Sequence, residues 1–247
     1  MKNIYIHISS LIIVVLVFMS SCQHKPNTTI AQALLLAGEH PDSALVLLNN
    51  MQFSELGKSE QAKYAVVYTM AQDKSGLDVD EDSLIRIGYN WYEKHPADSL
   101  YAKCQYYMGK YYMLNDSTEF AIRCLDRSYK ASEKIDDILT ECLALEKLSK
   151  VEKMTDAKQA LLHARMAIDK CERDTRISLA NKIYFRLNLC EALEFADSSA
   201  IALKECKTAL SLAEELGDSL VLADTYQDMS RFFHDVGMYR KARTCAK

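Results

Sequence analysis

Hydrophobic positions recur at helical spacing along this chain, and the stretch Tyr106–Ser128 shows the pattern most clearly. Its first half carries an apolar, aromatic-rich stripe that ends at Met113, and a second stripe begins at Ala121. Between the two stripes, Asp116 stands three residues before Glu119, which is typical of a capping box at a helix start. The stretch therefore predicts two helices, helix A and helix B, joined by a short turn.

The same arrangement recurs along the chain. Four successive A helices carry a small residue at the same position of the repeat. These residues are Gly109, Ser149, Cys190 and Ser230, and they are 40, 41 and 40 residues apart in the sequence. In three of these copies, a second small residue follows twelve positions later in helix B, namely Ala121, Ala202 and Ala242. Facing small residues let antiparallel helices approach closely, so we expect Gly109 to pack against Ala121. The steady step indicates a tandem repeat of about 40 residues and not a non-repetitive helical bundle.

The periodicity predicts helices over most of the chain, and Asp-Ser pairs mark several of their starts. Expected helices cover 30–38, 43–51, 59–73, 83–94, 99–114, 117–134, 137–154, 156–172, 177–195, 198–216, 219–235 and 238 onward. The pairs lie at 42–43, 82–83, 98–99, 116–117, 197–198 and 218–219, where short oxygen-bearing side chains can cap a first turn. Glycine and proline are scarce, and no strand-like alternation persists. The sequence predicts an all-α solenoid of antiparallel helix pairs.

Residues 1–21 do not fit the repeat. A basic Lys2 precedes the unbroken apolar run Leu11–Met19, and the small residues Ser20 and Ser21 then precede Cys22. A run this short, followed by small residues, predicts a cleaved export signal; an uncleaved anchor helix is the alternative. Residues 22–29 then form a polar tether, and residues 30–247 form the repeat domain with its last repeat incomplete.

Candidate chemistry is sparse in the repeat domain. Asp78, Asp80 and Asp82 alternate, but Ser83 and Tyr89 stand where a calcium loop needs glycine and glutamate. No glycine-rich phosphate loop, nucleophile elbow or metal-ligand spacing of histidines occurs, so we expect no catalytic residue, no metal site and no cofactor. The formal net charge is −4 and the basic residues are scattered, which argues against a nucleic-acid surface.

The remaining cysteines are interpreted as small core residues. Seven of them, from Cys104 to Cys245, fall in predicted helices at unrelated spacings, which is not typical of a disulfide framework or a zinc site. Cys190 and Cys206, which we expect on facing helices of one repeat, are the only pair considered for a disulfide bond.

The small-residue register, the Asp-Ser breaks and the Ser-Ser-Cys sequence resemble the tetratricopeptide-repeat lipoproteins of Gram-negative bacteria over residues 22–247. The resemblance implies a right-handed superhelix, cleavage after Ser21 and a lipid on the Cys22 thiol. We therefore expect the protein in the cell envelope, anchored to a membrane, and the lack of an acidic run after Cys22 favours a position facing the periplasm.

The resemblance also implies a partner-binding groove lined by the second, fifth, ninth and twelfth positions of the A helices. These positions hold Lys103, Tyr106, Lys110, Met113, Glu146, Lys150, Lys153, Tyr184, Leu187, Glu191 and Glu194. The middle of this groove is expected to be basic and its later part acidic, which suits a partner segment with one acidic and one basic end.

Three functions are therefore considered. The first is a membrane-tethered scaffold that binds a protein or peptide in the envelope. The second is the periplasmic sensory part of a membrane-linked transcription regulator, and the third is an accessory role in polysaccharide capture. Because the chain stops at Lys247, ten residues into a helix that begins at Met238, we expect a truncated version of a longer protein, with a frayed last hairpin.

Overall fold

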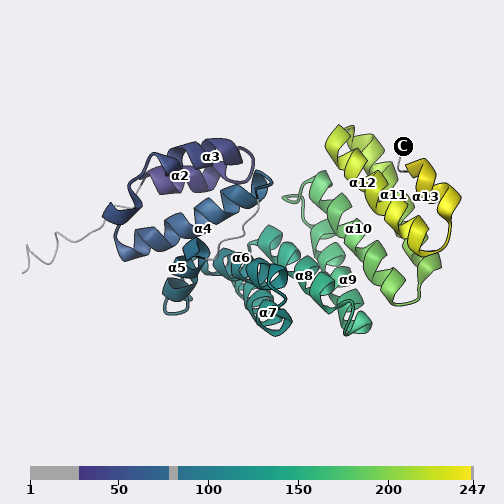
Figure 1. Ribbon diagram of the computed structural model, residues 1–247, viewed down its shortest axis with the longest axis horizontal. Helices are drawn as coiled ribbons and strands as arrows, with labels where there is room; N and C mark the ends of the chain where they lie inside the picture. Colours follow the sequence, from purple (N-terminus) through teal and green to yellow (C-terminus); the bar gives the residue numbers. More distant parts are fainter. Residues whose placement is uncertain (1–27, 78–82, 246–247) are drawn as a thin grey trace, which may run out of the picture.

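Antiparallel helix pairs follow one another in the computed structural model, which describes residues 28–77 and 83–245 (Figure 1). The A helices are α2 (Thr28–Leu36), α4 (Lys58–Lys74), α6 (Tyr101–Leu114), α8 (Ile138–Glu152), α10 (Leu179–Phe195) and α12 (Ser219–Asp235). The B helices are α3 (Pro41–Asn49), α5 (Ser83–Tyr92), α7 (Thr118–Ile135), α9 (Ala157–Arg173), α11 (Ser199–Leu216) and α13 (Tyr239–Cys245). The described residues contain no strand, which confirms the all-α class.

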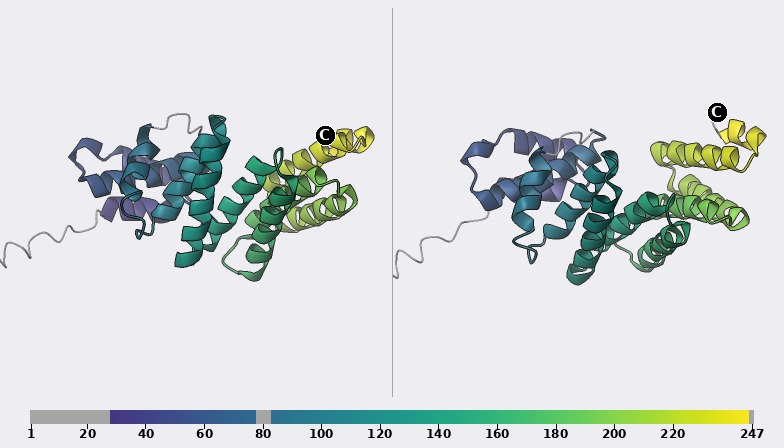
Figure 2. Two further views of the ribbon diagram at one scale, coloured as in Figure 1. Left: turned by 90° about the horizontal axis from the view of Figure 1, so that it is seen from below. Right: turned by 60° about the horizontal axis from the view of Figure 1, so that its bottom comes forward.

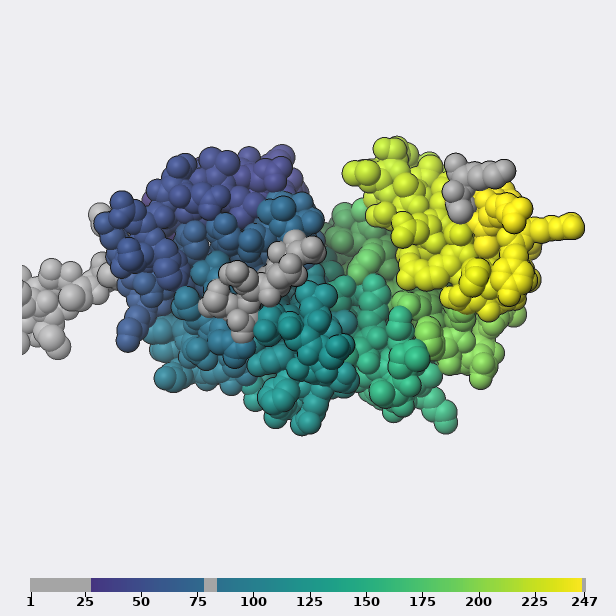
Figure 3. Space-filling view, viewed as in Figure 1, coloured from purple at the N-terminus to yellow at the C-terminus, as the bar shows by residue number. Residues whose placement is uncertain are grey.

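Stacking of the pairs elongates the molecule, so that α2 and α13 lie at opposite ends (Figures 1 and 2). Each helix packs against its sequence neighbours, and consecutive A helices also contact one another from α2 to α12. In the space-filling view, the surface is hollowed between the helices of the N-terminal end and α12 (Figure 3). No described helix is both long and apolar enough to cross a membrane.

The repeat architecture is confirmed, and the atoms nearest to Gly109 belong to Leu125, a residue other than the expected Ala121. A Cβ built on Gly109 would lie 2.7 Å from Cγ and 2.8 Å from Cδ2 of Leu125 on α7, and its nearest neighbours do not include Ala121. Hydrogen bonds between paired helices support the repeat register. One example joins two residues of the register: the Ser230 hydroxyl donates to the carbonyl oxygen of Ala242 at 3.0 Å. The close approach of α6 and α7 thus depends on a glycine that faces a leucine.

Several Asp-Ser pairs terminate a helix as well as precede one. Asp116 and Asp197 have positive φ values of 52° and 53°, the left-handed conformation that closes an A helix. Gly237 occupies the same place after α12, with a φ of 75°. The capping box expected at Asp116 is therefore absent, and Ser117 is the N-cap, without a side-chain capping bond. Aspartate serves here because its short polar side chain tolerates the left-handed region.

Two other Asp-Ser pairs, at 218–219 and 42–43, differ in whether their aspartate caps a helix. Asp218 caps α12 as expected, since its carboxylate accepts from the N–H groups of Leu220 and Val221 at 2.9 and 3.2 Å. Asp42 was expected to begin a helix but lies inside α3, which begins at Pro41 because proline suits a first helical turn. The acidic loop 78–82 lies outside the described residues, as does Cys22.

The core consists mainly of small and aliphatic side chains where A and B helices meet. One buried cluster extends from α2 to α8, and a second extends from α8 to α13. Cys190 and Cys206 lie in the second cluster as free cysteines. The two cysteines lie on the paired helices α10 and α11, as expected, but no disulfide bond joins them.

Candidate functional site: a groove between α10 and α12

Ion pairs join consecutive A helices along most of the solenoid. In each pair, a lysine on one A helix, or at its C-terminal end, lies beside a carboxylate of a neighbouring A helix. The pairs are Lys110 with Asp73, Lys103 with Asp137 and Lys153 with Glu191. Asp137 is also the N-cap of α8 and accepts from the N–H of Thr140 at 3.2 Å. These lysines neutralise carboxylates, so they hold helices together and are not free for a ligand.

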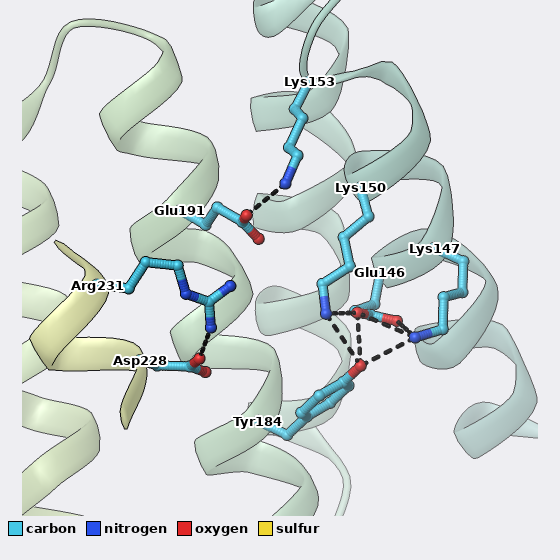
Figure 4. A network of polar contacts seen from close by, with 8 residues as sticks. All are labelled: Glu146, Lys147, Lys150, Lys153, Tyr184, Glu191, Asp228 and Arg231. Atoms are coloured by element: carbon cyan, nitrogen blue, oxygen red, sulfur yellow. Dashed lines mark hydrogen bonds and ion pairs between the residues drawn. The ribbon is translucent and has the colours of Figure 1, made fainter. Parts of the chain in front are cut away.

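A buried cluster between α8 and α10 strengthens this arrangement (Figure 4). The Glu146 carboxylate is fully buried and accepts from the Tyr184 hydroxyl at 2.7 Å. Lys150 lies 2.7 Å and Lys147 3.1 Å from the same carboxylate. Burial by itself raises the pKa of Glu146, but the two ammonium groups and the tyrosine hydroxyl outweigh it, so the pKa is lowered. Both carboxylate oxygens of Glu146 thus lie within ion-pair distance of a lysine, although Oε2 accepts no hydrogen bond from a described side chain. The cluster engages Lys147 and Lys150, and the expectation of a basic middle of the groove stays a prediction.

The ladder of ion pairs stops after α10. No ion pair joins the described side chains of α10 to those of α12, although the two helices are in contact. A cavity of about 70 Å³ lies there instead, and a recess of about 270 Å³ adjoins it. Lys150, Tyr184, Leu187 and Asp228 line both. Together the cavity and the recess follow α10 from Ala180 to Phe195, and we call them the α10–α12 groove.

Asn188 gives this groove an unsatisfied donor. Its side chain lines the cavity, the residue is only 4% exposed, and its Nδ2 has no hydrogen-bond partner among the described residues. A buried polar group without a partner costs about 1–3 kcal/mol, so such groups are usually paired. Asn188 therefore places an unpartnered amide donor at the wall of the groove.

Carboxylates lie on both sides of the cavity. Glu191 and Glu194 belong to α10, whereas Asp228 and Asp235 belong to α12. Burial, followed by the charges of Asp235 and Glu191, raises the pKa of Glu194. Burial also raises the pKa of Asp228, against the opposing effect of Arg231. The cavity is thus an acidic site that three part-buried carboxylates, Glu191, Glu194 and Asp228, and the exposed Asp235 line together.

The structure brings five of the residues predicted for the groove to this cavity, namely Lys150, Tyr184, Leu187, Glu191 and Glu194. The other predicted residues do not line the cavity. Lys103, Lys110 and Lys153 form the ion pairs between A helices, and Glu146 belongs to the buried cluster. Tyr106 lies in the core, and Met113 is half-buried near the end of α6.

Sequence reasoning missed Asn188 and the whole α12 wall of the groove. Continuing the same register onto α12 would have placed Gln227 and Arg231 at the fifth and ninth positions, beside Asp228. No comparable signal marked Asn188, because a polar residue two positions before Cys190 has no distinctive spacing.

Comparison with known proteins identifies the fold class. No protein-family model matches the chain, and no curated protein sequence matches it. Rap protein in complex with Competence and Sporulation Factor has a similar structure, with a TM-score of 0.64 and 15% identity over 88% of this chain. A signal transduction ATPase with numerous domains from Pyrococcus horikoshii, which carries a tetratricopeptide-repeat sensor, gives 0.63 and 13% identity over 90% of this chain.

These similarities define the class of fold: the chain is built of helix pairs like those of tetratricopeptide-repeat proteins. The chain spans 62% of the Rap structure and 36% of the ATPase structure. At such low identity, the similarity extends to the fold alone, and function has to be argued from the groove.

Proposed function

We propose that this chain is a binding scaffold that holds an extended segment of a protein or peptide partner in the α10–α12 groove. The observation that carries the proposal is the buried, unpartnered amide donor of Asn188 at the groove wall. A peptide backbone presents a carbonyl oxygen at every residue, so it can satisfy this donor whatever its side chains. The complex of the similar Rap protein with Competence and Sporulation Factor supports the use of this fold for binding.

Site-specific photo-crosslinking tests the proposal. A photo-reactive residue replaces Gln227, an exposed residue of α12 that lines the groove, and in a control it replaces Lys207, an exposed residue of α11. We expect cells to yield a discrete cross-linked partner at position 227 and none at position 207. Adding Asn188→Ala should remove that product while the helical content is retained, because the change deletes an unpaired donor. Equal products at both positions, or a product indifferent to Asn188→Ala, would refute the proposal.

We also propose that a lipid on Cys22 holds the scaffold at a membrane of the cell envelope, facing the periplasm. The apolar run Leu11–Met19 and the Ser-Ser-Cys sequence support this assignment. Two or more acyl chains on one residue give stable anchoring, whereas a single chain binds only weakly. Cys22→Ala should therefore leave the precursor uncleaved or release the protein from membranes upon fractionation. A variant of unchanged processed size that still sediments with membranes would contradict the lipid anchor.

A further inference from the structure

The α10–α12 groove differs from the other junctions between A helices in its balance of charge. Elsewhere a lysine meets a carboxylate, as Lys153 meets Glu191 between α8 and α10. At the cavity between α10 and α12, four carboxylates gather with only two cationic side chains, Lys150 and Arg231. The cavity therefore carries an excess of negative charge of about two units, if every carboxylate is ionised.

The two cationic side chains of the cavity are already engaged. Lys150 is bound to the buried Glu146 carboxylate, and Arg231 pairs with Asp228, one turn away on its own helix (Figure 4). Glu194 makes no ion pair or hydrogen bond with another described side chain, and Asp235 meets only the exposed His234, at 3.1 Å. Two carboxylates at the cavity are thus left without a strong cationic partner from this chain.

We propose that the cavity is a specificity pocket for one basic side chain, arginine or lysine, of the bound segment. This inference rests on the proposed function and names the chemistry that the groove selects. The basic head would lie between Glu194 and Asp235, where a carboxylate of α10 and one of α12 face the same cavity. The basic head would play the part that Lys153 plays between α8 and α10, where it pairs with Glu191.

The walls of the cavity fit the rest of such a side chain. Leu187, Phe195 and Phe232 supply apolar surface beside the carboxylates. Lysine and arginine bury their aliphatic stems against apolar groups while the charged head stays at a polar edge. A volume of about 70 Å³ has room for several water molecules, which matches the end of one long side chain and is too small for a bulky cofactor.

The Asn188 amide is an independent sign that this place receives a ligand. It lines the same cavity, is buried, and donates to nothing in the described chain. A backbone carbonyl oxygen of the bound segment can accept from it while the adjacent basic side chain enters the pocket. Backbone recognition by Asn188 and side-chain recognition by Glu194 would then be separate contributions that separate variants can remove.

Selection from a random dodecapeptide display library on the full chain, kept in detergent, tests the inference. We expect the enriched peptides to share arginine or lysine at one aligned position. Replacing that residue by glutamine in a selected peptide should weaken its binding to the wild type by about tenfold or more, the size expected for loss of a charged hydrogen bond. Glu194→Gln should weaken the binding of the selected peptide by a similar factor. The glutamine-substituted peptide should then bind this variant about as well as the selected peptide does. Glu214→Gln, the same change at an exposed position of α11, should leave binding unchanged.

The outcomes separate the two proposals. Enriched peptides that depend on Asn188 but carry no basic residue at a fixed position would overturn the pocket and leave the scaffold proposal intact. A loss of binding by Glu214→Gln equal to that by Glu194→Gln would also overturn the pocket, because the effect would then come from the general charge. If no peptide is enriched, both proposals fail. If enrichment persists unchanged in Asn188→Ala, the scaffold proposal fails in the form given above, and the pocket is then judged by Glu194→Gln alone.

Discussion

Gly109→Ala offers the sharpest test of how α6 and α7 are held together. The added Cβ would lie 2.7 Å from Cγ of Leu125, closer than the 3.0 Å that real Cβ contacts keep. Leu125 is fully buried, and in a close-packed interior its side chain can move aside only if its neighbours also move. Overpacking of this kind costs about 1–3 kcal/mol, and the better helix propensity of alanine returns about 0.5–1 kcal/mol. The middle of each range gives an expected net loss of about 1 kcal/mol of unfolding free energy.

Urea denaturation followed by far-UV circular dichroism measures this loss, and amide exchange locates it. In a repeat protein each pair contacts only its neighbours, so faster exchange should concentrate in α6 and α7. Gly38→Ala is the matched control, since a Cβ there meets nothing within 4 Å and its stability should change by less than about 0.5 kcal/mol. In Leu125→Ala the leucine is absent, and adding Gly109→Ala to that variant should cost little more.

A Gly109→Ala protein as stable as the wild type would refute this reasoning. It would mean that α7 can move away from α6 without loss of packing, so the glycine would not set the distance between the two helices. An equal penalty with and without Leu125 would refute it as well, because the strain would then arise elsewhere.

Two further predictions concern the buried cluster and the chain end. Glu146→Gln should lower the unfolding free energy by about 1–3 kcal/mol at neutral pH, because Lys147 and Lys150 lose their shared anion. Since the pKa of folded Glu146 is depressed, its contribution is present above the ordinary value of 4.5 and is lost as pH falls through the folded pKa. Urea titrations should show the advantage of the wild type shrinking below pH 4.5, and a constant difference would contradict the charge assignment. Amides of α13 should exchange faster than those of α11, because α13 packs against α12 and buries only Ala242; equal protection would contradict this.

The sequence by itself determined the helices and their order. Helix formation depends on the local spacing of apolar residues and on turn residues, both of which are written along the chain. The 40-residue step of Gly109, Ser149, Cys190 and Ser230 therefore predicted the repeat, and the paired position of Cys190 and Cys206 followed from it. The role of Asp116 was mistaken because one aspartate can either cap the next helix or close the previous one, and only the backbone angle distinguishes the two.

Only the tertiary structure decided which charges are free. Lys110, Lys150 and Lys153 look alike in sequence, yet each lies beside a carboxylate that an adjacent helix, or an earlier turn of its own helix, supplies. The electrostatic state of a side chain depends on neighbours within a few ångströms, and most of these neighbours are 34 to 38 residues away in the chain. For the same reason, the excess of carboxylates and the unpaired Asn188 amide in the α10–α12 groove became visible only after the two helices were placed side by side.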